Sequence, residues 1–263
     1  MSHRLLRNSA KLKSLKMVKH QPRNLLARNS KKPAMSKEYI IKSSSKSLQE
    51  RREYQLFGYI NVFIKDPIKN DVNMSLVLKK IEETIPRDFT YGLELIMVGE
   101  FEDLKSRDVK AVYQDGAIYV TNDQDSEDDL YDDLIHEISH SVEKTHASII
   151  FADGLLISEY LGKKERLMQL LKADGIVIPP DVPDLDYHRE FDEFLHYELG
   201  FEKAMNYCQG LFIESYASVS LSEYFATGFE AYFVDKQGEH LSKISPVLHE
   251  KIETLTNYVM EEY

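Results

Sequence analysis

Hydrophobic positions follow the period of strands in the first part of the chain and the period of helices afterwards. Three segments rich in β-branched and aromatic residues predict strands, at 54–64, 93–99 and 109–121. Within the last of them, Asp115 and Gly116 form the strongest short-range hairpin signal of the sequence. Residues 73–85 carry apolar side chains at helical spacing and end before Pro86, which predicts a helix between the first two strands.

A helical pattern starts after Ser126, which forms a capping box with Asp129 three residues later. The acidic run 123–129 also suggests calcium, but it lacks the glycine that a calcium loop needs at its sixth position. Further helices are expected at 155–175, 186–212, 220–236 and 247–263, with a proline-rich break at 177–184. Strands followed by helices predict an α+β fold in one domain.

Charge divides the chain into two parts. Residues 1–37 hold eleven of the 33 Lys and Arg residues and none of the 44 Asp and Glu residues, which leaves 22 basic against 44 acidic residues in 38–263. We therefore expect a basic, disordered tail at 1–37 and a folded domain at 38–263 that includes a helical insertion at about 147–212. Nucleic acid or an acidic partner would bind only through the tail, because the domain is acidic.

Little in the sequence indicates a membrane segment or an oxidising compartment. No apolar run reaches the length of a membrane span and no apolar leader is visible, so we expect a cytoplasmic protein without membrane contact. The tail is also compatible with a transit peptide or with virion association, because it is basic and free of acidic residues. The single cysteine, Cys208, cannot form an internal disulfide and is expected to be a small buried hydrophobe.

Residues 135–146, IHEISHSVEKTH, contain the strongest chemical motif of the sequence. On a helical wheel His136, Glu137 and His140 share one side, while a continuous apolar stripe occupies the other. Histidines at i and i+4 can bind one Zn²⁺ at about 2.0–2.1 Å from each nitrogen, and the adjacent glutamate can take a proton from a water on the metal. A solvated helix with two chance histidines is the simpler alternative.

Two residues compete for the place of a third ligand. His146 has the outer spacing of H-E-x-x-H-x-x-G-x-x-H, but Glu143 occupies the glycine position, so the helix would carry His146 about 15 Å along its axis from His136. The second candidate is Glu223, which shares a helix face with small residues that allow a close approach of two helices. Tyr216, seven residues earlier, would then bring its hydroxyl near the metal. The simpler alternative is that Tyr216 is a core residue and that Glu223 is part of a helix cap.

The HEISH motif, Tyr216, Glu223 and the run EYFATGF together resemble the gluzincin peptidases of the anthrax lethal factor and Pro-Pro endopeptidase group. The resemblance covers roughly residues 110–235 and implies a zincin-like fold with a small mixed sheet packed on the HExxH helix. The roles it implies are zinc ligation by His136, His140 and Glu223, general base catalysis by Glu137, and oxyanion stabilisation by Tyr216. The 83 residues between His140 and Glu223 depart from the family pattern and leave the substrate class open.

The resemblance implies hydrolysis of a protein or peptide substrate by metal-activated water. It also implies that the strand at 117–121 borders the cleft and pairs with an extended substrate. Asp133 and Glu230 share faces with the metal groups, but we expect both to be surface charges rather than partners of a histidine. The alternative function is a catalytically silent zincin-fold protein for binding or assembly, for example in a viral particle or toxin complex. A third possibility is a dormant enzyme whose cleft is blocked by the tail or by the insertion.

Overall fold

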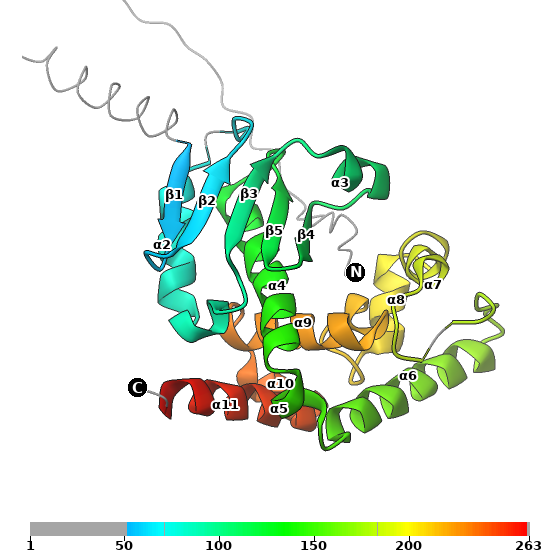
Figure 1. The fold of residues 1–263 in the computed structure, drawn as a ribbon. Coiled ribbons are helices and arrows are strands. Elements are labelled where there is room, and N and C mark those ends of the chain that lie inside the picture. Colours follow the sequence, from blue (N-terminus) through cyan, green and yellow to red (C-terminus); the bar gives the residue numbers. More distant parts are fainter. Residues whose placement is uncertain (1–51, 71, 183, 262–263) are drawn as a thin grey trace, which may run out of the picture.

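The computed structural model describes residues 52–70, 72–182 and 184–261, so the tail at 1–37 lies outside the described residues (Figure 1). The strands are β1 (Glu53–Leu56), β2 (Ile60–Ile64), β3 (Leu95–Gly99), β4 (Ala111–Gln114) and β5 (Ala117–Thr121). The helices between them are α2 (Met74–Thr84), η1 (Arg87–Thr90) and α3 (Glu102–Arg107). The helices that follow are α4 (Glu127–Thr145), α5 (Ala147–Phe151), α6 (Leu155–Ala173), α7 (Arg189–Glu193), η2 (Phe194–Glu198), α8 (Phe201–Cys208), η3 (Tyr216–Ser218), α9 (Leu221–Phe233), α10 (Gly238–Ile244) and α11 (Pro246–Glu261). The α+β prediction is confirmed.

The sheet is mixed and has the strand order β1-β2-β3-β5-β4. β1 pairs with β2 and β4 pairs with β5 in antiparallel fashion, whereas β2, β3 and β5 run parallel. The predicted hairpin turn is confirmed, because Asp115 and Gly116 both have positive φ angles of 48° and 85°, as a tight two-residue turn requires. The β-rich run 54–64 is also a hairpin rather than one strand, with Phe57 and Gly58 in left-handed conformations at its turn.

One face of the sheet carries the core, and α2 and α4 pack against it (Figure 1). Alternate strand residues such as Val62, Ile96 and Ile118 are fully buried, which is the two-residue period of a sheet with one covered face. On α4 the predicted apolar stripe is buried, including Leu134 and Ile138. Among the described residues, a small apolar cluster around α3 packs on the opposite face of the sheet.

The long helix α4 lies between the sheet and α9, which crosses it near its C-terminal half (Figure 1). Both helices begin as the sequence predicts. The Ser126 hydroxyl accepts a hydrogen bond from the Asp129 N–H at 3.2 Å, and the Ser220 hydroxyl accepts one from the Glu223 N–H at 3.1 Å. The second cap fixes Glu223 in the first turn of α9, on the side that faces α4.

The region 147–212 is mainly helical, as predicted, and it holds the segment that leads into α9. Tyr160 of α6 donates a hydrogen bond to the Ser218 carbonyl at 3.0 Å, and the Leu185 carbonyl accepts one from the Leu221 N–H at 2.9 Å. The carboxylate of Glu159 accepts hydrogen bonds from two N–H groups in the first turn of α11. Within the described ranges, we find no helix with the length and apolar character that crossing a bilayer would require.

We expect Gly228→Ala to destabilise the protein. A Cβ at this position of α9 would stand 2.3 Å from the Cδ2 atom of Leu248, which is buried in α11. Such overpacking lowers the free energy of unfolding by about 1–3 kcal/mol. The matched control is Gly162→Ala in α6, where nothing lies within 4 Å and alanine should stabilise the helix by about 0.5–1 kcal/mol. Thermal and urea unfolding of both variants measures the contrast, and equal stabilities would contradict the close contact of α9 with α11.

Candidate metal centre

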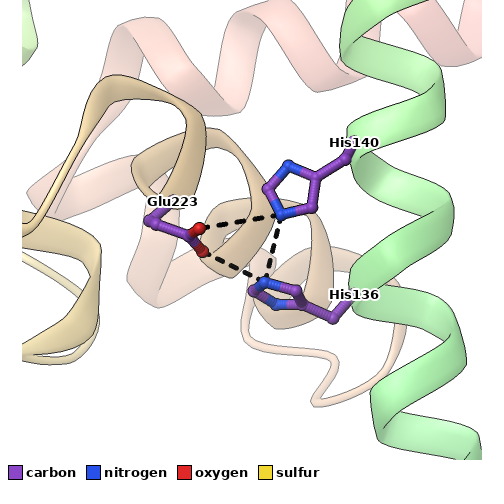
Figure 2. A group of neighbouring side chains, drawn as sticks. All are labelled: His136, His140 and Glu223. Carbon is purple, nitrogen blue, oxygen red and sulfur yellow. Dashed lines mark hydrogen bonds and ion pairs between the residues drawn. The ribbon is translucent and has the colours of Figure 1, made fainter. Parts of the chain in front are cut away.

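Three buried side chains converge where α9 crosses α4 (Figure 2). His136 and His140 extend from successive turns of α4, and Glu223 reaches toward them from α9. Their exposed fractions are 0%, 4% and 0%. One ligand atom of each residue lies within 4.8 Å of the others, so the group can hold a metal ion.

The separations of the donor atoms suit a tetrahedral cation. The Nε2 atoms of the two histidines lie 3.2 Å apart. The Glu223 carboxylate oxygens lie 3.0 Å from the His136 Nε2 and 3.8 Å from the His140 Nε2. Ligand atoms at Zn²⁺ bonding distance in a tetrahedron are about 3.3 Å apart, and the spacing of the two nitrogens, and of each nitrogen from its nearest carboxylate oxygen, is close to this value.

The contact of the second ring nitrogen of His136, Nδ1, determines which nitrogen carries the proton. Its Nδ1 atom contacts the Oε1 atom of Glu230, a carboxylate on α9 that is 8% exposed. A carboxylate accepts hydrogen bonds, so Nδ1 carries the proton and the Nε2 atom of the neutral ring presents a lone pair to the centre.

His140 is oriented in the same way through a hydroxyl group. The Ser222 hydroxyl donates to the Oε2 atom of Glu143 at 2.5 Å, so its oxygen is left to accept from the His140 Nδ1 at 3.1 Å. The neutral His140 therefore also turns a lone pair of Nε2 toward the centre. Both rings are held in the tautomer that binds a metal.

Three electron-pair donors thus point at one buried position, which is unfavourable unless positive charge lies between them. Burial alone would lower the pKa of His140, but the negative charges of Glu223 and nearby carboxylates outweigh it and raise the pKa to about 9. Burial and the carboxylates oppose each other in the same way at His136, whose pKa is also raised. Without a metal the site holds protons, and a divalent cation would displace them.

Glu137 lies beside the centre and is fully buried. Its Oε2 atom accepts a hydrogen bond from the backbone N–H of Tyr113 in β4 at 2.6 Å, while its Oε1 atom has no hydrogen-bond partner in the described structure. Burial raises the pKa of Glu137, although the two histidines and the Tyr113 N–H act in the opposite direction. One oxygen is therefore fixed by the backbone of β4, and the other has no hydrogen-bond partner among the described residues.

Tyr216 is also brought to the site. It lies in the short helix η3, and its ring centroid is 6.3 Å from that of His136, with the hydroxyl oxygen buried. The structure therefore gathers all five residues that the sequence singles out: His136, Glu137, His140, Tyr216 and Glu223. The alternative ligand His146 is not among them. It ends α4, where its Nδ1 contacts the Thr145 hydroxyl.

Two expectations about neighbouring residues are wrong. Glu230 is not a surface charge, because it is buried against His136. Asp133 is also buried, at 6% exposure, and its carboxylate accepts a hydrogen bond from Gln124. A helical wheel gives the direction of a side chain but not the element that covers it, which explains both errors.

The expected cleft strand also needs a correction. The segment 117–121 is β5, which lies inside the sheet between β3 and β4 and has both edges paired. The edge strand is β4, at 111–114, and it contacts α4 and the Glu137 carboxylate. The sequence could not show this order, because the parallel pairing of β3 with β5 is nonlocal.

Sequence reasoning missed the contacts of three groups: the Tyr113 N–H, Ser222 and Glu143. Glu143 follows His140 by three residues and so shares its helix face, which was an available signal. Ser222 precedes Glu223 directly, but no local pattern marks it as a partner of His140. The Tyr113 N–H is a backbone group that only the fold can place.

Comparison of the chain with protein-family models, with curated proteins and with solved structures gave no match.

Replacing any one of the three converging side chains should weaken metal binding strongly. His136→Ala, His140→Ala and Glu223→Ala each remove one donor, whereas His146→Ala removes a histidine of the same helix that lies outside the group. We expect zinc content near one equivalent in the parent and the His146 variant, and far below it in the other three. Metal analysis after dialysis measures this, and full zinc content in the Glu223 variant would contradict the assignment of the third ligand.

Glu230→Gln should weaken zinc binding without abolishing it. The amide can no longer hold the His136 proton by a charged hydrogen bond, and the loss of such an outer partner costs about 10–100-fold in metal affinity. A competitive chelator titration measures the change. The matched control is Glu250→Gln on the exposed surface of α11, for which we expect unchanged affinity.

Proposed function

We propose that the chain is a zinc-dependent endopeptidase of gluzincin type with a zincin-like fold. The observation that carries this proposal is the convergence of His136, His140 and Glu223 beside a buried glutamate with one unpartnered oxygen. A mixed sheet packed on the helix of the HExxH motif supports it. Zn²⁺ bound by these three residues would supply Lewis acidity and lower the pKa of a coordinated water to about 7.

Glu137 acts as the general base in this reaction. Its Oε1 atom takes the proton of the attacking water and then delivers it to the leaving amine, while the Tyr113 N–H holds Oε2 in place. Tyr216 donates a hydrogen bond from its hydroxyl to the oxyanion that develops on the substrate carbonyl. Glu230 and Ser222 keep the two histidines in the required tautomer.

The substrate is an extended peptide that lies along β4. The outer side of this edge strand faces α4 and the general base, because the Tyr113 N–H points there and not into the ladder with β5. Main-chain hydrogen bonds to an edge strand fix the direction of a peptide independently of its side chains. A scissile carbonyl would thus be held near both Glu137 and the ligand group.

A catalytically silent zincin-fold protein is the second candidate, and the deep burial of the ligands favours it. A closed structural site needs neither a general base nor an open path to a ligand. Against it stand Glu137, whose free oxygen is not used by the fold, and a surface pocket that His140 lines together with β4. These two features support catalysis over a purely structural role.

Glu137→Gln should abolish most cleavage while leaving zinc content unchanged. The amide keeps the shape of the side chain but cannot accept the water proton, and loss of a general base lowers kcat by about 10²–10⁴-fold. Cleavage of casein and of a peptide library, with zinc analysis of the same samples, measures both properties. Tyr216→Phe should retain zinc and also lower kcat, and Glu250→Gln should match the parent.

If zinc is bound but the parent cleaves nothing, the binding or assembly protein is the better assignment. If the full chain is inactive and a chain lacking residues 1–37 cleaves, the enzyme is dormant until its tail is removed. Equal cleavage by the parent and by Glu137→Gln would show that the activity comes from a contaminant or another site.

A further inference from the structure

A pocket of about 450 Å³ opens directly beside His140. One wall is the end of β4 and its turn, and the other is the last part of α4 with α5. The residues that line it are Tyr113, Gln114, Asp115, His140, Glu143, Lys144, Ala147, Phe151 and Ser222. Because His140 belongs to the ligand group and Tyr113 holds the general base, a substrate side chain in this pocket would lie next to the scissile bond.

The carboxylate of Glu143 in this pocket has no lysine or arginine partner among the described residues. Lys144 is bound by Asp115 at 3.2 Å. In the described part of the chain, the ion-pair contact of Glu143 is with the His140 Nδ1, at 3.6 Å. With a metal on Nε2 that imidazole is neutral, so the negative charge of Glu143 is not neutralised within the pocket.

The remaining lining suits a long amphipathic side chain. Phe151, Ala147 and the ring of Tyr113 provide apolar contact, and the Glu143 carboxylate and Ser222 provide a polar end. Lysine and arginine have this character, with an apolar stem and a charged head. The excess of 44 acidic over 22 basic residues in 38–263 favours the approach of cationic rather than anionic peptides.

We propose that this pocket selects substrates with a lysine or arginine at the residue beside the scissile bond, and that Glu143 determines this preference. The inference rests on the proposed peptidase function. Glu143 also supports His140 through Ser222, so a loss of activity alone would not identify a role in specificity. The two roles differ in what they change. Support of His140 affects every substrate alike, whereas pairing with the substrate affects only basic ones.

The test uses two sets of peptides. One set varies the residue before the cleaved bond and the other varies the residue after it, with Arg, Lys, Gln, Met or Glu at the varied position. We expect the parent to cleave the Arg or Lys peptides with a kcat/KM about 10–100-fold higher than the Gln and Met peptides, which is the effect of one hydrogen bond to a charged group. Glu143→Gln should reduce this ratio to near one, and Glu143→Lys should favour the Glu peptide.

Ser222→Ala is the matched variant, because it removes the hydroxyl that bridges Glu143 and His140 and leaves the Glu143 carboxylate in place. It should lower kcat/KM for all peptides and keep the preference for basic residues. Glu250→Gln should change neither property. Zinc content is measured in every sample.

The assignment of Glu143 is overturned if the parent cleaves basic and neutral peptides with equal kcat/KM, or if the preference for basic peptides survives in Glu143→Gln. The peptidase function stands in both cases. An equal loss for all peptides in Glu143→Gln shows that the residue only supports His140, and this result also overturns the assignment. If the zinc-loaded parent cleaves no peptide of the panel or of a wider library, the peptidase function fails, and the inference fails with it.

Discussion

The structure depends on one constraint: three electron-pair donors from two helices point at one buried position. The two imidazoles come from α4 and the carboxylate from α9, and all three side chains are almost fully buried. Leaving a buried carboxylate without compensation costs several kcal/mol. The site is therefore stable only when protons or a cation occupy its centre, and the raised pKa values of both histidines express the same constraint in the metal-free protein.

The crossing of α4 and α9 must be held firmly for this arrangement to persist, and the region 147–212 contributes to that. Tyr160 and Lys164 of α6 reach the carbonyl groups of Ser218 and Val219, which lie just before α9, and Leu185 binds the first N–H of the helix. These contacts fasten the short segment that carries Tyr216 and the Ser220 cap. The large helical region between the two motifs therefore positions Glu223, in addition to extending the fold.

Local signals in the sequence predicted local structure well. The Ser126 cap, the turn at Asp115 and Gly116, and the polar side of the HExxH helix all depend on residues close together in the chain. The grouping of Glu223 with the two histidines could also be predicted, because a face of small residues marks where one helix can approach another.

The remaining features could not be predicted because they depend on pairing between distant segments. Whether β4 or β5 forms the sheet edge depends on the parallel pairing of β5 with β3, which the hairpin pattern does not contain. Glutamate is usually a surface residue, but Glu230 is buried where α9 meets His136. The prediction of a surface position for Glu230 was wrong because its contact with His136 outweighs the ordinary preference of a glutamate for water.

The two histidines are not equivalent, and in the proposed peptidase this difference bears on the side from which a substrate enters. His136 is fully buried and lies between the carboxylates of Glu223 and Glu230. His140 instead lines a surface pocket. Tyr113 lines the same pocket and donates its N–H to Glu137. A peptide on the edge strand would thus reach the centre from the His140 side, and its backbone would contact the same strand that orients the general base.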